Sequence, residues 1–480
     1  MSKARLIIRN FILIFSSNVI GQLFYLGGLI HLARTFGPVG FGLWNFAQAW
    51  LIYLLRGGEM GFEVIGVKEI ARHPDRTPNL ITAVITSRCI LLLILATFLF
   101  IAIECRLIPE DVRILVVIFS LSLIPMAFIL EWVFEGHQSL LSVSIARIAK
   151  GVIFFILVVL FVKSTYDVTL SSFFYVISLT VPILYVGWSA VRSFGMANFR
   201  ETFYLLPQLW RSALPVGCAT LLSNYSLFIG TMVIGYTMQH DQLGYYTASH
   251  RMVIFLWAYI IANLQRVVLP TLSNLFQISS DSFQSFVERF LRFAAMISIG
   301  IGLSVTLFSK IIIKILYTER YAASVPILQI LVWAFVMASI RAILEIALLA
   351  SDRQKMYFIG MIFVATLYTM LTPFLVSIYG INGAAYAALI SESSYLVFLV
   401  VLWSRERYSI IWKSIVKFFI AGSIAIGLLF TIQWNIVFAS SITVIVYLGL
   451  LLLLKVYSVS ELTELPKLAR EIFTKEKIYN

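Results

Sequence analysis

Apolar runs separated by short polar segments recur along almost the whole chain. Most runs are about 20 residues or longer, the length that an α-helix needs to cross the hydrocarbon core of a bilayer. The apolar residues are continuous rather than alternating, so the pattern predicts membrane-spanning helices and not the strands of a transmembrane barrel. Run lengths and periodicity predict about fourteen spans, at residues 9–33, 40–66, 79–103, 111–134, 140–163, 170–192, 212–236, 243–268, 288–308, 322–349, 355–377, 380–403, 413–433 and 435–455.

Composition and charge agree with an all-α integral membrane protein. Hydrophobic residues make up 60% of the chain and charged residues 12%, against about 25% charged residues in soluble domains. The net charge of +13 is unevenly spread, because most lysines and arginines fall in segments that the spans place on one side. This positive-inside bias predicts a multi-pass protein of the cell inner membrane with both termini in the cytoplasm, and it explains the basic balance without nucleic acid.

The three cysteines are scattered along the chain, so we expect neither a disulfide framework nor a metal site. No segment outside the spans is long enough to form a folded domain, and the function must therefore reside inside the membrane. A membrane enzyme is expected to carry carboxylates or an acidic metal-binding motif in a sizeable loop, and the outer loops are short and contain none. We therefore expect no catalytic residues and no cofactor.

Short motifs in the first half of the chain recur in the same order in the second half. Ser-Asn lies inside spans one and seven, the runs FGLWNFA and LGYYTAS open spans two and eight, and LEWVFEG and LEIALLA close spans four and ten. Six spans separate equivalent positions, which predicts a parallel repeat with two pseudo-symmetric six-helix lobes around a central cleft, plus two C-terminal helices. The predicted organisation is an N-terminal lobe (1–192), a cytoplasmic linker (193–211), a C-terminal lobe (212–403), spans thirteen and fourteen (404–455) and a cytoplasmic tail (456–480).

An arginine lies deep inside the second predicted span. Arg56 falls about 22 Å along a helix that begins at Phe41, too deep for its side chain simply to reach the interface. Charged groups at such depth usually face a bundle interior or an aqueous cavity, so we interpret Arg56 as part of a cationic cavity wall. The alternative is an ion pair with Glu59 or Glu63 that only holds helices together.

The repeat places a second arginine, Arg251 of span eight, in a position comparable with that of Arg56. Aligning Phe41 with Leu243 puts Arg251 opposite Ala49, two helical turns from Arg56 on the same helix face. The predicted cavity residues are Arg56, Arg251, Asn18, Gln22, Asn45, Gln48, Glu59, Asn224, His250 and Gln265. For His250, a hydrogen-bonded packing role is the alternative to a role in the cavity.

The later spans contain an oppositely charged pair and a single carboxylate. Arg341 and Glu345 are four residues apart on span ten and are expected to satisfy one another. Glu392 of span twelve lies near the middle of the membrane and is a candidate for coupling to a proton or a cation, although one carboxylate does not make an ion site.

Four stretches resemble the polysaccharide-repeat flippases of the Wzx-like family, within the multidrug, oligosaccharidyl-lipid and polysaccharide exporter superfamily. They are RTFGPVGFGLWNFAQAW (34–50), LPVGCATLLSNYSLFIGTMVIGY (214–236), LGYYTASHRM (243–252) and YGINGAAYAALISE (379–392). The resemblance extends over nearly the entire chain. It implies two lobes in a V around a central cavity bordered by spans one, two, seven and eight.

The same resemblance implies a flippase that moves undecaprenyl-diphosphate-linked oligosaccharide from the cytoplasmic to the periplasmic leaflet for O-antigen-like surface polysaccharide. It also implies alternating access, H⁺ or Na⁺ coupling, and a polysaccharide polymerase and chain-length proteins as partners besides membrane lipids. Two alternatives stay open. One is a cation-coupled multidrug exporter on the same fold, and the other is a membrane glycosyltransferase or polymerase that acts on the same lipid carrier.

Overall fold

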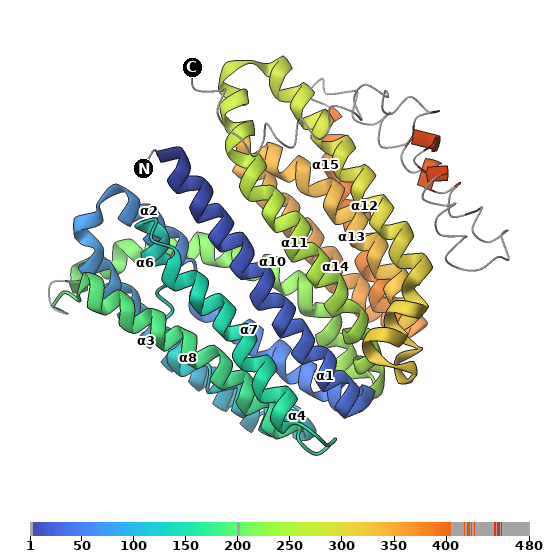
Figure 1. Ribbon diagram of the computed structural model, residues 1–480, viewed down its shortest axis with the longest axis horizontal. Helices are drawn as coiled ribbons and strands as arrows, with labels where there is room; N and C mark the ends of the chain where they lie inside the picture. Colours follow the sequence, from blue (N-terminus) through green and yellow to red (C-terminus); the bar gives the residue numbers. More distant parts are fainter. Residues whose placement is uncertain are drawn as a thin grey trace. The chain divides into compact units, whose positions relative to one another are not determined.

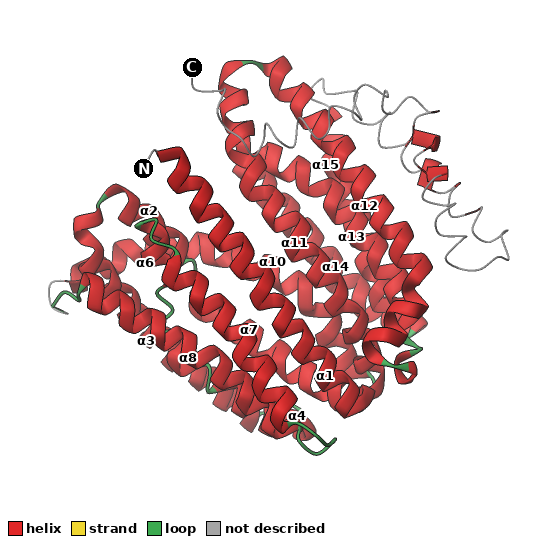
Figure 2. Cartoon of the chain, in the orientation of Figure 1, coloured by secondary structure: helices red, strands yellow, loops and turns green. Residues whose placement is uncertain are grey.

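The computed structural model describes residues 3–198 and 202–404, together with isolated positions between 417 and 453. Nearly all of these residues are helical, and no strand occurs among them (Figure 2). The prediction of an all-helical membrane fold is therefore confirmed. Most of the two last predicted spans, 413–433 and 435–455, and the whole tail 456–480 lie outside the described residues.

The chain divides into two compact units, Met1–Thr247 and Ala248–Asn480, and most of their helices are labelled in Figure 1. The first unit contains α1 (Lys3–Glu59), α2 (Phe62–Arg72), η1 (Pro74–Arg76), α3 (Thr77–Glu104), α4 (Glu110–Ser120), α5 (Leu123–Met126), α6 (Glu131–Gly136), α7 (Leu141–Phe161), α8 (Val168–Phe194), η2 (Phe203–Leu205) and α10 (Leu206–Thr237). The second contains α12 (Ser280–Tyr317), η3 (Glu319–Tyr321), α13 (Ser324–Ala350), α14 (Gln354–Tyr379) and α15 (Ile381–Ser404). The division falls within α11 (His240–Ile278), and the predicted lobe boundaries remain a prediction.

Among the described residues, eight helices are long and apolar enough to cross a membrane, or nine if the bent pair Phe203–Leu222 and Tyr225–Thr237 is one span. This is fewer than the predicted number, in part because the stretch Ile12–Arg72, which covers nearly all of the first two predicted spans, counts once. The two helices of α1 meet at Gly37, where φ is 67° and ψ is −176°. A positive φ suits glycine, which has no Cβ, and Pro38 follows directly without a backbone N–H.

The fourth predicted span, 111–134, is not one helix, and the prediction of a continuous helix there was wrong. The segment instead forms α4, α5 and α6 in succession. Pro125 cannot donate a backbone hydrogen bond, and its ring clashes with the carbonyl of the residue four positions earlier in a continuous helix. That residue is Leu121, and the first break lies there, between α4 and α5. The second break, from Ala127 to Leu130, makes α6 a separate short helix.

A reciprocal glycine contact within the first unit reflects the internal repeat. A Cβ added at Gly42 would lie 2.0 Å from the carbonyl oxygen of His240, and one added at Gly244 would lie 2.0 Å from the carbonyl oxygen of Pro38. His240 and Gly244 stand 202 positions after Pro38 and Gly42. Gly42 thus contacts the repeat counterpart of Pro38, and Gly244, the repeat counterpart of Gly42, contacts Pro38 itself. Reciprocal contacts of this kind are those of a two-fold interface. Only glycine permits this approach of α1 to the beginning of α11.

A buried ion-pair group joins α13 and α15 in the second unit. Arg341 Nη1 donates to Glu345 Oε1 at 2.6 Å, and Arg341 Nε donates to Glu392 Oε2 at 2.5 Å. The guanidinium carbon also lies 5.0 Å from the centroid of the Tyr395 ring. One arginine therefore holds two carboxylates in an apolar interior. The i, i+4 pair on α13 was expected, but the link to Glu392 on α15 comes from tertiary packing.

Replacing Gly42 with leucine should destabilise the protein, because the new side chain would overlap the backbone of His240 and backbone atoms cannot move aside cheaply. Overpacking of this kind costs about 1–3 kcal/mol, which should lower the temperature of unfolding of the detergent-solubilised protein by several degrees. Gly300→Ala is the matched control, because nothing lies within 4 Å of a Cβ added at Gly300. Equal unfolding temperatures for the two variants would contradict the close contact.

Replacing Arg341 with methionine should be severely destabilising, because it leaves Glu345 and Glu392 without a countercharge in the interior. Removing one partner of a buried pair costs about 3–5 kcal/mol. Adding Glu345→Gln and Glu392→Gln should restore much of the loss in unfolding temperature and in expression, since no uncompensated charge then remains. Lys310→Met, at an exposed site on α12, serves as the control. A triple variant no more stable than Arg341→Met would show that burial of charge is not the cause.

Candidate functional site in the first unit

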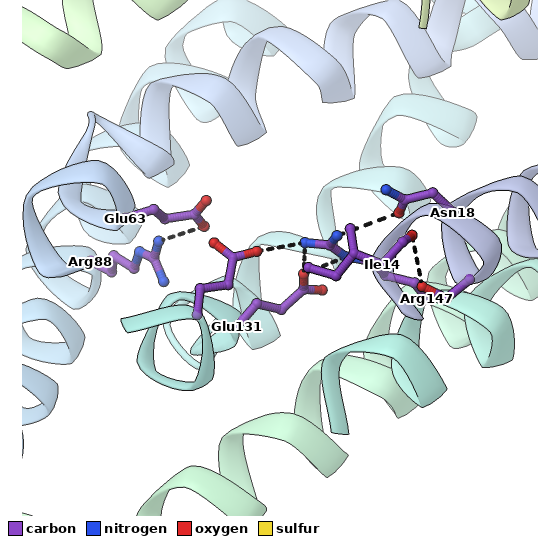
Figure 3. A network of polar contacts seen from close by, with 8 residues as sticks. Ile14, Asn18, Glu63, Arg88, Glu131 and Arg147 are labelled. Carbon is purple, nitrogen blue, oxygen red and sulfur yellow. Dashed lines mark hydrogen bonds and ion pairs between the residues drawn. The ribbon is translucent and has the colours of Figure 1, made fainter. Parts of the chain in front are cut away.

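Charged side chains from several helices of the first unit gather around Arg147 of α7. Arg147 Nη2 donates to Glu131 Oε2 and to Glu135 Oε1, each at 2.8 Å. Its Nε donates to Glu131 Oε2 at 3.0 Å, and its Nη1 donates to Asn18 Oδ1 of α1 at 3.4 Å (Figure 3). The short helix α6 supplies both carboxylates. A single guanidinium therefore links α1, α6 and α7.

The approach of α7 to α1 beside Arg147 depends on two glycines. A Cβ added at Gly151 would lie 1.8 Å from the carbonyl oxygen of Gly21, and one added at Gly21 would lie 2.3 Å from the carbonyl oxygen of Arg147. Larger residues at either position would push the two backbones apart. The glycine pair therefore sets the distance between α1 and the charged part of α7.

Arg88 and Glu63 form a second ion pair next to these groups. Arg88 Nη2 donates to Glu63 Oε1 at 3.1 Å, and Arg88 Nη1 donates to the carbonyl oxygen of Ile129. The Arg88 side chain is fully buried, whereas 38% of the Glu63 side chain is exposed. Arg88 therefore anchors α2 and the break before α6 to α3, and it leaves the Glu63 carboxylate at an accessible surface.

Arg56 and Glu59 form the third pair, at 2.5 Å between Arg56 Nη1 and Glu59 Oε2. The pair that was considered as an alternative is thus present, but it does not enclose the arginine, because 40% of the Arg56 side chain remains exposed. A guanidinium has five N–H donors. The Glu59 contact uses only Nη1 among the described residues, so Arg56 retains donors for a further acceptor.

Electrostatic interactions connect the three ion pairs into one cluster. Glu63 interacts with Arg88, Glu59, Glu131 and Glu135. Lys150 of α7 interacts with Glu131, Arg56, Glu59 and Arg147. We call these eight residues the charged cluster: Arg56, Glu59, Glu63, Arg88, Glu131, Glu135, Arg147 and Lys150. Its formal charge is zero, with four cations and four carboxylates, several of them accessible.

The asparagine and glutamine side chains that were predicted to line the cavity in the first unit have different environments. Asn18 joins the charged cluster through Arg147, and Gln22, one turn later on α1, is half-buried. Asn45 and Gln48 are each only 1% exposed. Asn45 donates to the carbonyl oxygen of Phe41, and Gln48 donates to Tyr25 Oη, so both amides lie in the packed interior of the first unit.

The other predicted cavity residues lie in α10 and α11, and the residue predicted for ion coupling lies in α15. The side chains of Asn224 and Gln265 lie outside the described part of the chain. In the second unit, His250 is buried, and Arg251 is half-buried and interacts electrostatically with His250 and Tyr317. Glu392, the candidate for ion coupling, accepts hydrogen bonds from Arg341.

Sequence reasoning assigned no site role to Arg147 and Lys150, or to Glu131 and Glu135. A signal was present for the two cations, because both fall inside the apolar run 140–163. The roles of the two glutamates could not be found in this way, since they depend on the break that separates α6 from α5. No group of three or more histidines, cysteines, aspartates or glutamates in the described residues is placed to hold a metal ion.

Comparison with known proteins agrees with this arrangement. Residues 7–276 match a family described as "Polysaccharide biosynthesis protein". A relative from Escherichia coli (strain K12) is 22% identical over 376 residues, which cover 75% of this chain and 88% of the relative. A relative from Shigella flexneri is 26% identical over 408 residues, which cover 79% of this chain and 93% of the relative. Both carry the name "Putative O-antigen transporter".

Solved structures of transporters share the fold. The lipid II flippase MurJ, in an inward closed conformation, matches with a TM-score of 0.76 at 14% identity over 93% of this chain and 98% of that chain. An inward-facing multidrug resistance MATE family transporter of the MOP superfamily matches with a TM-score of 0.66 at 16% identity over 82% and 96% of the two chains. These relatives are named as transporters and flippases and not as enzymes.

The family match covers more than half of the chain, and the structural matches cover most of it. The chain is therefore a multi-pass membrane protein of the polysaccharide biosynthesis protein family with the fold of the MOP superfamily transporters.

Proposed function

We propose that this protein is a lipid-linked polysaccharide flippase. Its substrate is an undecaprenyl-diphosphate-linked oligosaccharide, which it moves from the cytoplasmic to the outer leaflet of the inner membrane for surface polysaccharide of the O-antigen type. The names of the two sequence relatives and the likeness to a lipid flippase support this class of substrate. The observation that carries the proposal is the accessible guanidinium of Arg56, in the last turn of α1 at the end of a long apolar stretch.

The diphosphate is the part of such a substrate that resists crossing the membrane. Its negative charge needs a countercharge in a region of low dielectric constant. Arginine is suited to this task because it stays charged and can donate two parallel hydrogen bonds to phosphate oxygens. The unused donors of Arg56 can make these bonds while Glu59 holds its Nη1. The polyprenyl chain would remain in lipid, and no covalent bond is made or broken.

Arg251 is the second cation in this proposal. Arg251 belongs to predicted span eight, which corresponds in the repeat to span two with Arg56. It therefore remains a proposed ligand of the diphosphate. In an alternating-access cycle driven by H⁺ or Na⁺, the two arginines would release the diphosphate on the outer side. The polymerase and the chain-length proteins that act on the flipped product are the proposed protein partners, and both termini would lie in the cytoplasm.

A cation-coupled exporter of drugs is the second candidate, and one observation favours it. Glu63, Glu131 and Glu135 each expose about a third of the side chain, and accessible carboxylates are suited to bind cationic compounds. Each of them is, however, paired with an arginine. Efflux of a fluorescent cation such as ethidium by vesicles that do not flip lipid-linked oligosaccharide would favour this candidate over the flippase.

Arg56→Ala and Arg251→Ala should each reduce flipping about tenfold or more, because a hydrogen bond to a charged group is worth about 1.5–3 kcal/mol. Lysine at either position should retain part of the activity, since it keeps the charge and loses the two-donor geometry. The measurements are the amount of surface polysaccharide and the leaflet in which the lipid-linked intermediate accumulates. Arg320→Ala, at an exposed site in η3, is the control. Normal flipping by both alanine variants at normal expression would remove the diphosphate-binding role.

A further inference from the structure

Lys150 lies near the middle of a membrane-spanning helix. It is the tenth residue of the 21-residue helix α7, about 14 Å from the helix start at a rise of 1.5 Å per residue. A lysine at this depth is costly unless it faces a partner or a water-filled cavity. Its side chain is nevertheless exposed.

The exposed apolar stripe of α7 shows which side of the helix faces lipid. Leu141, Ile145, Ile156 and Leu160 are exposed and fall within about 100° of one another around the helix, whereas the exposed Phe161, the last residue of α7, lies outside this stripe about 20° from Lys150. At 100° per residue, Lys150 points about 130° away from the centre of this stripe. It lies about 60° from Arg147 around the helix, on the side of α7 that carries the charged cluster. Lys150 is therefore exposed at the accessible surface of the charged cluster and not on the apolar stripe.

The neighbours of Lys150 carry charges that cancel. It interacts with Glu131 and Glu59 and with Arg56 and Arg147, two negative and two positive groups. Among the described residues, the three arginines of the cluster each form an ion pair with a cluster carboxylate, whereas none of the ion pairs includes Lys150. Glu131, one of its two negative neighbours, is already hydrogen-bonded to Arg147. The ammonium group thus keeps its donors for a ligand.

We propose that Lys150 binds a phosphate oxygen of the substrate's diphosphate, together with the unused donors of Arg56. This inference rests on the proposed function and names a further binding residue for it. Lysine binds phosphate as a point charge with three donors, so it complements the planar guanidinium of Arg56. Arg147 has a different role. Its donors are engaged by Glu131, Glu135 and Asn18, so it positions α7 and does not bind the ligand.

The test is binding of farnesyl diphosphate to the purified full-length protein in detergent, with farnesol as the uncharged probe. Lys150→Gln should weaken binding of farnesyl diphosphate about tenfold or more and leave binding of farnesol unchanged, because only the diphosphate contacts the ammonium group. Lys150→Arg, which keeps a positive donor, should retain most of the affinity. Lys163→Gln is the matched control, since Lys163 lies beyond the end of α7 and its Nζ donates to the carbonyl oxygen of Val159.

Two results would overturn the inference. One is wild-type protein that binds farnesyl diphosphate no more tightly than farnesol. The other is Lys150→Gln protein that binds farnesyl diphosphate like the wild type, which is the result expected if Lys150 only balances the charge of Glu131 and Glu59.

A parallel assay of wild-type protein in vesicles separates this inference from the proposed function. Vesicles that fail to flip lipid-linked oligosaccharide, while Lys150→Gln still abolishes diphosphate binding, would overturn the flippase and support the anion site. Vesicles that flip the substrate with full activity in the Lys150→Gln variant would overturn the anion site and support the flippase.

Discussion

Charge inside a membrane protein must be paired or hydrated, because an isolated charge in hydrocarbon costs several kcal/mol. This constraint explains why α6 and α7 of the first unit lie together. Arg147 would be costly at its depth in α7 without the carboxylates of Glu131 and Glu135. The same bonds place an otherwise short and weak helix, α6, against its neighbours. The ion pairs therefore determine the position of α6, which its intrinsic helix propensity alone would not stabilise.

The two units meet the constraint in different ways. In the second unit, Arg341 is buried with Glu345 and Glu392, and its guanidinium lies over the ring of Tyr395. Such an enclosed group serves the packing of α13 and α15. In the first unit, the charged cluster exposes parts of Arg56, Glu63 and Lys150. Accessible charge of this kind is suited to a charged ligand, and this difference is why the proposed binding chemistry centres on the first unit.

Glycines determine where these charges can meet. At Gly21 and Gly151 the backbones of α1 and α7 come so close that a Cβ on either would overlap the other helix. Small residues allow this approach between helices that have no hydrophobic driving force to associate in lipid. The contact of Gly42 with the beginning of α11 follows the same rule. Close backbone packing thus brings polar side chains of different helices into hydrogen-bonding range.

The sequence by itself determined that the chain is a helical membrane protein with an internal repeat and that Arg56 belongs to a long apolar run. These properties depend on the length of apolar runs and on their recurrence, which are local features of a linear chain. It could not determine that Pro125 divides the fourth span, that Gln48 donates to Tyr25 in the interior, or that Arg147 pairs with Glu131. Those outcomes depend on which helices come within a few ångströms of one another. The energy of a hydrogen bond or an ion pair is decided by that distance and by exposure to water, so only the tertiary structure could assign the partners.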